Sequence, residues 1–322
     1  MPEPVIVVTR TWPATVEQEL QRRYPDARLN VGDVPLGHDG LRAALEQADV
    51  VLPTVSDQLP AELFDGSLRT RFLGNFGVGY NHIDIDAAAR AGIVVTNTPR
   101  VLTDTTADTA MTLLLMVARR AGEGEREVRA GRWTGWRPTH MMGADVTGKT
   151  LGIVGMGRIG VAVARRGHYG FGMPVIFYDP VDFEPPHGIL GAQRVGTVEE
   201  LLAVADFVSL HMPGGGENTH LIDTARLALM KPTAFLINSA RGDIVDSSAL
   251  VKALQSGTIA GAGLDVYEGE PNVPQALRDL ENAVLLPHLG SATLETRTAM
   301  GMLVLENLAD FLAGRDPSCR VT

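Results

Sequence analysis

The stretch that decides the fold begins Leu151-Gly-Ile-Val-Gly155-Met-Gly157-Arg-Ile-Gly160 and ends at Asp179. A short apolar run precedes the glycines, a helical pattern follows them, and a second apolar run, Val175–Tyr178, closes the stretch. Each glycine has a physical task in such a unit. The first permits a tight turn, the second lets the backbone approach a pyrophosphate, and the third lets the helix pack on the strand. Together they predict a dinucleotide-binding βαβ unit.

The two ends of this unit predict how a dinucleotide is held. Arg158 and Ile159 begin the helix, whose free amides and dipole favour an anion. Asp179, followed by Pro180, ends the second strand, where a carboxylate can accept hydrogen bonds from the hydroxyls of an adenosine ribose. The ligand is therefore expected to be a dinucleotide.

Charge near Asp179 bears on which dinucleotide is preferred. A carboxylate repels a 2′-phosphate at close range, and Asp182 and Glu184 add negative charge. The next arginine along the chain is Arg194. We therefore expect NAD(H) to be preferred, with NADP(H) possible.

A second glycine motif, Gly143-Ala-Asp-Val-Thr-Gly148-Lys149-Thr150, matches the phosphate-loop pattern. That chemistry needs a strand before the glycines and a helix that begins at the lysine. Here the upstream residues make a poor strand, and an apolar run typical of a strand follows from Leu151. The motif is interpreted as a polar turn, which disfavours a phosphate-loop NTPase.

Short β-branched runs alternate with helical patterns along the chain, which is typical of parallel sheets in an α/β fold. Strands are predicted at Val5–Val8, Ala27–Val31, Val50–Leu52, Phe72–Asn75, Ile93–Thr96, Leu151–Val154, Val175–Tyr178, Phe207–Leu210, Ala234–Asn238, Ala262–Val266 and Val284–Leu286. The strands that follow Pro99 match in number those of a dinucleotide-binding doubly wound sheet.

Two long helices and one irregular segment complete this outline. One helix is predicted from Asp104, as its cap, to about Arg120, and the other from about Thr293 to Leu312, with Gly314 just beyond its end. Between them, residues 121–149 contain many glycines and are predicted to be irregular, as functional excursions often are.

The composition excludes several classes of protein. The chain has 322 residues and a formal net charge of −10. Nucleic acid and anionic membrane surfaces attract basic patches, so neither is an expected partner. The single cysteine, Cys319, fits a reducing cytoplasm. We find neither a secretory signal nor an apolar stretch long enough to span a membrane, so a cytoplasmic location is expected.

Further motifs carry a resemblance to a known family. They are Val101-Leu-Thr-Asp-Thr-Thr106-Ala-Asp108, Leu236-Ile-Asn-Ser239-Ala240-Arg241-Gly242, Asp265-Val-Tyr-Glu-Gly-Glu270-Pro271 and Leu286-Pro-His288-Leu-Gly290-Ser291-Ala-Thr293. With the glycine motif, they resemble the D-2-hydroxyacid dehydrogenases in order and spacing over essentially the whole chain. The first of them, together with Gly135-Trp136-Arg-Pro138, is similar to the glyoxylate and hydroxypyruvate reductase branch.

The resemblance implies an α/β architecture of two doubly wound parallel-sheet domains, with a Rossmann cofactor domain inserted into a flavodoxin-like substrate domain. Residues 1–99 and 289–322 would form the discontinuous substrate domain, and residues 100–288 the NAD-binding domain, including a dimerisation arm at about 121–149. A homodimer is implied. In it, Trp136 either approaches the neighbouring active site or only packs in the interface.

Matching positions also imply ligand contacts. The implied cofactor-binding residues are Thr106, Gly155, Gly157, Arg158, Ile159, Gly160, Asp179, Pro180, His211, Pro213, Thr219, Ser239, Ala240, Arg241, Asp265, His288 and Gly290. The implied substrate residues are Val78, Gly79, Trp136, Arg241, His288 and Ser291, with the amides of the first two holding the substrate carboxylate. The family often continues this last loop with Asp-Asn, whereas this chain has Asn81-His82.

Three residues are candidates for the chemistry of reducing a 2-oxo acid. Arg241 suits the fixed cation, because its planar fork binds a carboxylate and stays protonated. His288 suits the acid that protonates the carbonyl oxygen, because imidazole exchanges protons near neutral pH. Glu270 suits the group that keeps that acid charged, because a nearby carboxylate favours imidazolium. All three follow predicted strands, at the edge where open α/β sheets bind ligands.

We therefore predict an NAD(P)H-dependent enzyme that reduces a small 2-oxo acid, glyoxylate or hydroxypyruvate, to the 2-hydroxy acid, with His288 as proton donor. The alternatives are another specificity within the family and a non-catalytic NAD-sensing protein on the same fold. Phosphoglycerate dehydrogenase is less expected, because the regulatory extension often appended there has no room after Thr322. Formate dehydrogenase is disfavoured because it carries glutamine at the position of Glu270.

The remaining histidines are not expected to have catalytic roles. His82, His140, His168 and His187 are predicted to lie on surfaces or in turns. No spacing of histidine and acid typical of a metal site is present in the sequence, so no metal is expected.

Overall fold

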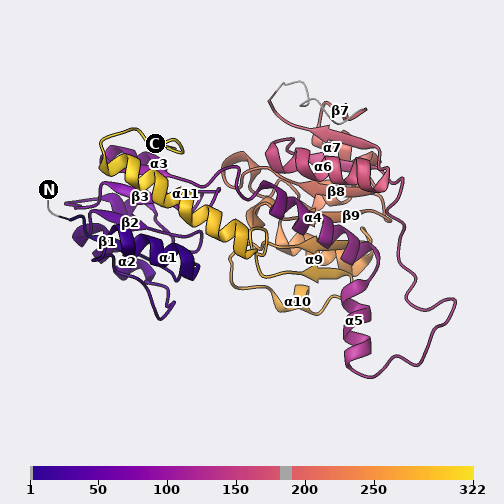
Figure 1. Ribbon diagram of the computed structural model, residues 1–322. Coiled ribbons are helices and arrows are strands. Elements are labelled where there is room, and N and C mark those ends of the chain that lie inside the picture. The colour runs from indigo at the N-terminus through magenta and orange to yellow at the C-terminus, as the bar shows by residue number, and fades with distance from the viewer. Residues whose placement is uncertain (1–2, 182–190) are drawn as a thin grey trace. The chain divides into compact units, whose positions relative to one another are not determined.

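The computed structural model describes residues 3–181 and 191–322 (Figure 1). They form two compact units. The first contains residues Met1–Leu102 and Ala292–Thr322, and the second contains Thr103–Ser291. Both junctions lie a few residues beyond the domain boundaries that the resemblance implies.

The first unit is built on a parallel sheet. Its strands are, in spatial order, β1 (Ile6–Val8), β2 (Val50–Leu52), β3 (Phe72–Gly74) and β4 (Val94–Thr96). The predicted strand at Ala27–Val31 is wrong as a strand, since only an isolated bridge joins Arg28 to Val7. Ala27 is buried but Val31 is 88% exposed, so the run lacks the apolar face that anchors a strand. With the bridge counted, the order is that of a flavodoxin-like sheet.

Helices from both ends of the chain surround this sheet. They are α1 (Ala14–Arg23), α2 (Gly37–Gln47), η1 (Ala61–Phe64), α3 (Ile85–Arg90) and α11 (Leu294–Leu312). Thr293 caps α11, and Gly314 lies just beyond its end, as predicted, with a positive φ of 72°. Val304 of α11 packs so closely on Gly74 that a side chain there would collide with it. The C-terminal tail also joins the sheet, because Val321 N donates to Val95 O.

The second unit is built on a larger parallel sheet. Its strands are, in spatial order, β11 (Ala283–Leu285), β10 (Gly261–Leu264), β9 (Phe235–Asn238), β8 (Phe207–Leu210), β5 (Leu151–Val154), β6 (Val175–Tyr178) and β7 (Gln193–Arg194). The direction of winding reverses at β5, between β6 and β8, which makes the carboxyl ends of β5 and β8 a topological switch point. The predicted α/β fold class is confirmed. The short, exposed β7 was not predicted.

Helices cover both faces of this sheet. They are α4 (Thr103–Ala118), α5 (Ala121–Arg129), α6 (Arg158–Phe171), α7 (Val198–Val204), η2 (Gly216–Asn218), α8 (Thr224–Leu227), η3 (Gly242–Ile244), α9 (Ser247–Ser256) and α10 (Gln275–Arg278). Leu113 of α4 belongs to one buried apolar cluster, and Leu250 of α9 belongs to another. With both faces buried, the ends of the strands are left for ligands.

Two helix predictions need correction. Asp104 lies in the first turn of α4 and does not cap it, and α4 ends at Ala118. The segment 121–149, predicted as irregular, begins with α5. No residue of α5 is buried, and Arg129 pairs with Glu125 one turn away. The prediction of an irregular segment rested on glycines such as Gly122 and Gly124, which disfavour a helix interior, whereas charged pairs stabilise α5.

The rest of that segment leaves the unit as a loop and then returns to β5 (Figure 1). Its end packs on the second unit, since Ala144 N donates to Ala118 O and Gly148 N donates to Phe171 O. Gly148 and Lys149 lie in a turn and β5 follows, so no helix begins at the lysine. The interpretation as a polar turn is confirmed. Within the described ranges, no helix is long and apolar enough to cross a membrane.

Candidate active site at the carboxyl edge of the second sheet

The glycine loop joins β5 to α6 at the switch point. Gly155 has a φ of +92°, and a Cβ there would lie 2.9 Å from the carbonyl carbon of His211, which follows β8. A Cβ on Gly160 would lie 2.2 Å from Gly155 O, so this glycine sets the distance between helix and strand. Gly157 precedes α6 and has open space around it. The loop thus exposes the N-terminus of α6, including Arg158 and Ile159, as a dinucleotide pyrophosphate requires.

Asp179 contacts the backbone of this loop. Its Oδ2 accepts a hydrogen bond from Met156 N at 2.8 Å, and its Oδ1 accepts one from Val181 N at 3.0 Å. Each carboxylate oxygen keeps a lone pair for a further donor. Pro180, next to it, is exposed.

The structure also brings Arg194 to this place. Its Nη2 donates to Asp179 O at 2.9 Å, because β7 pairs with β6. In the sequence, Arg194 is only the next arginine after Asp179. A polar strand of two residues has no apolar pattern that would predict its pairing with β6. Asp182, Glu184 and His187, on which we made predictions, lie outside the described residues.

His288 and Glu270 form a hydrogen-bonded pair after β11 and β10. His288 Nδ1 lies 2.9 Å from Glu270 Oε2, while Glu270 Oε1 accepts from Tyr267 N at 2.8 Å. A carboxylate only accepts, so Nδ1 carries the proton and Nε2 is directed elsewhere. Burial raises the pKa of Glu270, but the hydrogen bond and charge of His288 outweigh this, and the pKa of the carboxyl lies below its ordinary value.

Asp265 holds the backbone of the loop that carries His288. Its carbonyl oxygen accepts from His288 N at 3.0 Å, and its carboxylate accepts from Leu289 N at 2.6 Å and Gly290 N at 2.8 Å. These bonds stabilise His288 at a φ of 54°, which is unusual for a residue with a side chain. Burial raises the pKa of Asp265 despite these donors. Sequence reasoning took Asp265 for a cofactor ligand only and missed this role.

Thr106 of α4 lies behind the same loop. A Cβ on Gly290 would lie 3.4 Å from Thr106 Cγ2, so these two predicted cofactor residues are neighbours. Ser291, the last residue of the second unit, is half-buried.

Arg241 follows β9, the neighbour of β10, whose carboxyl end leads to the loop of Glu270. Its Nη1 donates to Ala240 O at 2.6 Å, and its carbonyl oxygen accepts from Asn238 Nδ2 at 2.8 Å. A Cβ on Gly242 would lie 1.9 Å from the carbonyl carbon of Tyr267, so the loop of Arg241 packs against the loop of Glu270. Burial lowers the pKa of Arg241, and the charge of Glu270 opposes that effect. The guanidinium remains a cation.

Ser239, two positions before Arg241, has a buried hydroxyl group. Its hydroxyl oxygen is buried and has no hydrogen-bond partner among the residues that the structure describes. Burying a hydroxyl without a partner is costly, so this atom is suited to a ligand group. Together with the open space at Gly157, it makes the edge fit a dinucleotide.

The loop after β8 lies next to the glycine loop. His211 Nε2 lies 2.8 Å from Ser209 Oγ, and burial lowers the pKa of His211 to about 3, so its imidazole is neutral. Asn218 Nδ2 donates to Pro213 O at 3.0 Å and holds the loop that ends at Thr219. The loop therefore presents neutral groups beside the glycine motif.

Three predicted substrate residues are not part of this cluster. Val78 and Gly79 belong to the first unit, in the loop after β3. Trp136 lies in the segment after α5 and is 82% exposed. No group of histidine, cysteine and acidic residues suited to a metal ion occurs in the described part of the chain.

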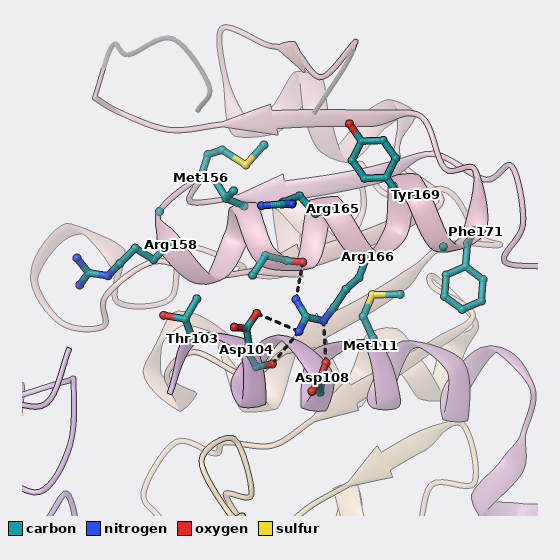
Figure 2. Close-up of a pocket in the computed structure, with 14 residues that line it drawn as sticks. Thr103, Asp104, Asp108, Met111, Met156, Arg158, Arg165, Arg166, Tyr169 and Phe171 are labelled. Atoms are coloured by element: carbon teal, nitrogen blue, oxygen red, sulfur yellow. Dashed lines mark hydrogen bonds and ion pairs between the residues drawn. The ribbon is translucent and has the colours of Figure 1, made fainter. Parts of the chain in front are cut away.

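A groove of about 1160 Å³ lies between α4 and α6 (Figure 2). Arg166 crosses it from α6, with Nε 2.7 Å from Asp108 Oδ1 and Nη2 3.1 Å from Asp104 Oδ1. Tyr169, also of α6, lines the groove and is 57% exposed. The sequence analysis did not identify this groove.

Comparison with known proteins agrees with this geometry. Residues 111–290 match the sequence profile of the D-isomer specific 2-hydroxyacid dehydrogenase, NAD binding domain. A glyoxylate reductase of Korarchaeum cryptofilum is 44% identical over 98% of this chain and 95% of its own. The NADPH-dependent glyoxylate/hydroxypyruvate reductase of Sinorhizobium meliloti, solved with NADP and malonate, is 36% identical with a TM-score of 0.86, covering 99% of this chain and 97% of that one.

A solved Polaromonas protein assigned to the same family superposes with a TM-score of 0.91 at 36% identity and covers 100% of both chains. The predicted resemblance is confirmed over the whole chain and not only over the cofactor unit. The chain belongs to the D-isomer specific 2-hydroxyacid dehydrogenases, in their glyoxylate reductase branch, and is an NAD(P)-dependent oxidoreductase.

Proposed function

We propose that this chain reduces glyoxylate or hydroxypyruvate to the corresponding 2-hydroxy acid. The observation that carries the proposal is the hydrogen-bonded pair of His288 and Glu270, held beside the cation Arg241 at the edge where the glycine loop opens. A 2-oxo acid offers a carboxylate to the cation and a carbonyl oxygen to the acid. We take glyoxylate and hydroxypyruvate as the proposed substrates from the names of the Korarchaeum and Sinorhizobium relatives.

In this proposal each of the three residues has one task. The bound nicotinamide cofactor supplies a hydride to the carbonyl carbon. His288 gives a proton to the carbonyl oxygen, so that the carbonyl group becomes an alcohol and the proton is later regained from water. Glu270 accepts from Nδ1 and thereby keeps a proton available on Nε2. Arg241 binds the substrate carboxylate and polarises the carbonyl.

The residues that would hold the cofactor are those at the carboxyl edge of the second sheet. The amides of Arg158 and Ile159 suit the pyrophosphate, and Asp179 suits the adenosine ribose. We propose that NADH is preferred, because the carboxylate of Asp179 repels a 2′-phosphate. Arg194, which contacts Asp179 O, is the group that opposes this preference, and the Sinorhizobium relative is NADPH-dependent.

We also propose that the first unit is the substrate domain, to which the amides of Val78 and Gly79 contribute. Backbone N–H groups of a tight loop bind a carboxylate as they bind other anions. The second unit then serves as the cofactor domain, with the junctions near Leu102 and Ser291.

The proposed assembly is a homodimer in which the segment 121–149 contacts a second copy. Large apolar side chains gather there with unusual exposure: Trp136 is 82% exposed, Met142 68%, Val128 59% and Trp133 53%. Large apolar side chains that are exposed along one segment are typical of interaction sites. Trp136 is the residue that would approach the neighbouring active site.

The test is to follow NADH oxidation with a panel of 2-oxo acids, together with the variant His288→Asn. We expect turnover of glyoxylate or hydroxypyruvate by the wild type. The variant should lose turnover by about 1000-fold, since the proton donor is gone, while NADH binding stays nearly intact because the other cofactor contacts remain. Wild-type protein that binds NADH but reduces none of the acids would favour the non-catalytic alternative.

A further inference from the structure

The loop that follows β3 turns three successive carbonyl oxygens toward two buried side-chain amides. Asn75 Nδ2 donates to Gly77 O at 3.2 Å and to Gly79 O at 3.0 Å. Asn97 Nδ2 donates to Val78 O at 2.8 Å. Asn75 is 0% exposed and Asn97 is 8% exposed, so water does not compete for these bonds.

The amides of this loop therefore face the opposite side. In a trans peptide the N–H of the next residue is directed away from the carbonyl. The N–H groups of Val78, Gly79 and Tyr80 must then be directed away from the two asparagines. Among the described residues, none of these three amides donates a hydrogen bond. Successive N–H groups on one side form a concavity that binds anions.

A histidine determines how the Asn75 amide is oriented. Because Nδ2 faces two carbonyls, which only accept, Oδ1 faces the other way, where His82 Nε2 lies 3.1 Å from it. An amide oxygen accepts, so His82 Nε2 carries a hydrogen. If His82 is removed, the buried Oδ1 loses this donor, and the Asn75 side chain is held less firmly against the carbonyls.

We propose that Asn75 and His82 are positioning residues for substrate binding. His82 orients the Asn75 amide, and Asn75 together with Asn97 holds the carbonyls so that the amides of Val78 and Gly79 face the substrate carboxylate. The inference rests on the proposed function, because it assigns these amides to a 2-oxo acid. It gives a role to a histidine at the position where this chain departs from the Asp-Asn of its family.

The experiment compares Asn75→Ala, His82→Ala and His82→Gln in the full chain. The probes are glyoxylate in steady-state kinetics and oxamate, an unreactive 2-oxo acid analogue, in binding to the NADH complex. We expect Asn75→Ala to raise the KM and the oxamate Kd about 10-fold or more, because the carbonyls lose two donors. The kcat should fall less than this, and the Kd for NADH should not change. His82→Ala should act in the same direction, and His82→Gln should restore wild-type values, since its amide nitrogen can donate to Oδ1.

Thr70→Val is the matched control. Thr70 is fully buried in the same unit, and its Oγ1 donates to Ala48 O at 2.9 Å, at the opposite end of β3. The control should lower the Tm without raising the KM. A KM for Asn75→Ala no higher than that of Thr70→Val would overturn the inference.

If Asn75→Ala does not fold, the two histidine variants test the inference by themselves. Equal KM values for His82→Ala and His82→Gln would contradict it. Failure of the proposed function is read separately, in the wild type. A wild type that neither reduces 2-oxo acids nor binds oxamate contradicts both proposals. One that binds oxamate without reducing any acid contradicts only the proposed function.

Discussion

Glu270 and His288 are joined at 2.9 Å through Oε2 and Nδ1, although 17 residues separate them in the chain. The second carboxylate oxygen is held by Tyr267 N at 2.8 Å, so Glu270 cannot rotate freely. The pair therefore fixes the orientation of the imidazole, keeps a proton on Nδ1, and favours the imidazolium, which can donate its second proton from Nε2.

Replacing Glu270 by glutamine should move the alkaline limit of the reduction reaction downward by about 1 pH unit. Reduction needs the protonated form of His288, and the interaction with that form holds the pKa of Glu270 below its ordinary value. Without the negative charge the protonated imidazole is less favourable, so the rate falls at a lower pH. The measurement is the pH profile of kcat/KM for glyoxylate.

Glu268→Gln is the control for this prediction. Glu268 lies two positions before Glu270 in the chain. Its carboxylate pairs with His220 at 2.7 Å and not with His288. Its variant should keep the wild-type profile. An unshifted profile for Glu270→Gln would refute the functional pairing.

Arg241→Lys should lower kcat/KM for glyoxylate by about 100-fold. Lysine keeps the charge but offers no planar fork for a carboxylate, so both KM and kcat should suffer. Arg226→Lys, which changes an arginine paired with Glu199 on α7, should have no such effect. Near-wild-type kinetics of Arg241→Lys would remove this residue from its proposed role.

Asp179→Ala should change the ratio of kcat/KM for NADH to that for NADPH by about 10-fold in favour of NADPH. The variant removes both an acceptor for the ribose hydroxyls and a charge that repels a 2′-phosphate. Arg194→Ala should act in the opposite direction, because its guanidinium lies at Asp179 O. If the wild type already prefers NADPH, the proposed preference is wrong. If the ratio is the same in Asp179→Ala, this carboxylate does not discriminate.

Trp136→Ala should weaken self-association, with a rise in the dimer Kd of about 30-fold. The expected cause is loss of a large apolar contact from a side chain that is 82% exposed in one copy. Sedimentation over a concentration series measures this Kd. Leu229→Ala, which changes a leucine that is 44% exposed on another surface, should leave it unchanged. A fully active wild-type monomer would contradict the dimer and the role of Trp136 together.

Much of the second unit could be predicted from local sequence because its requirements are local. Gly155 is needed where φ is +92°, and Gly160 is needed where a helix touches its own preceding turn. The strands that precede Arg241 and His288 are parallel, so their carboxyl ends lie at one edge of the sheet. The glycine spacing and the apolar runs indicated the cofactor unit, and the motifs of the resemblance indicated these two residues.

Only the tertiary structure decided the features that depend on contacts between distant segments. The two-residue β7 has no apolar pattern, yet its pairing with β6 carries Arg194 to Asp179. The carboxylate of Asp265 accepts hydrogen bonds from the amides of Leu289 and Gly290, which lie 24 and 25 positions later in the chain. His82 was expected in a turn without a role, and folding places it against the buried Asn75 amide. Hydrophobic periodicity reports which face of an element is buried, but hydrogen-bond partners are set by how elements pack, and that depends on the whole chain.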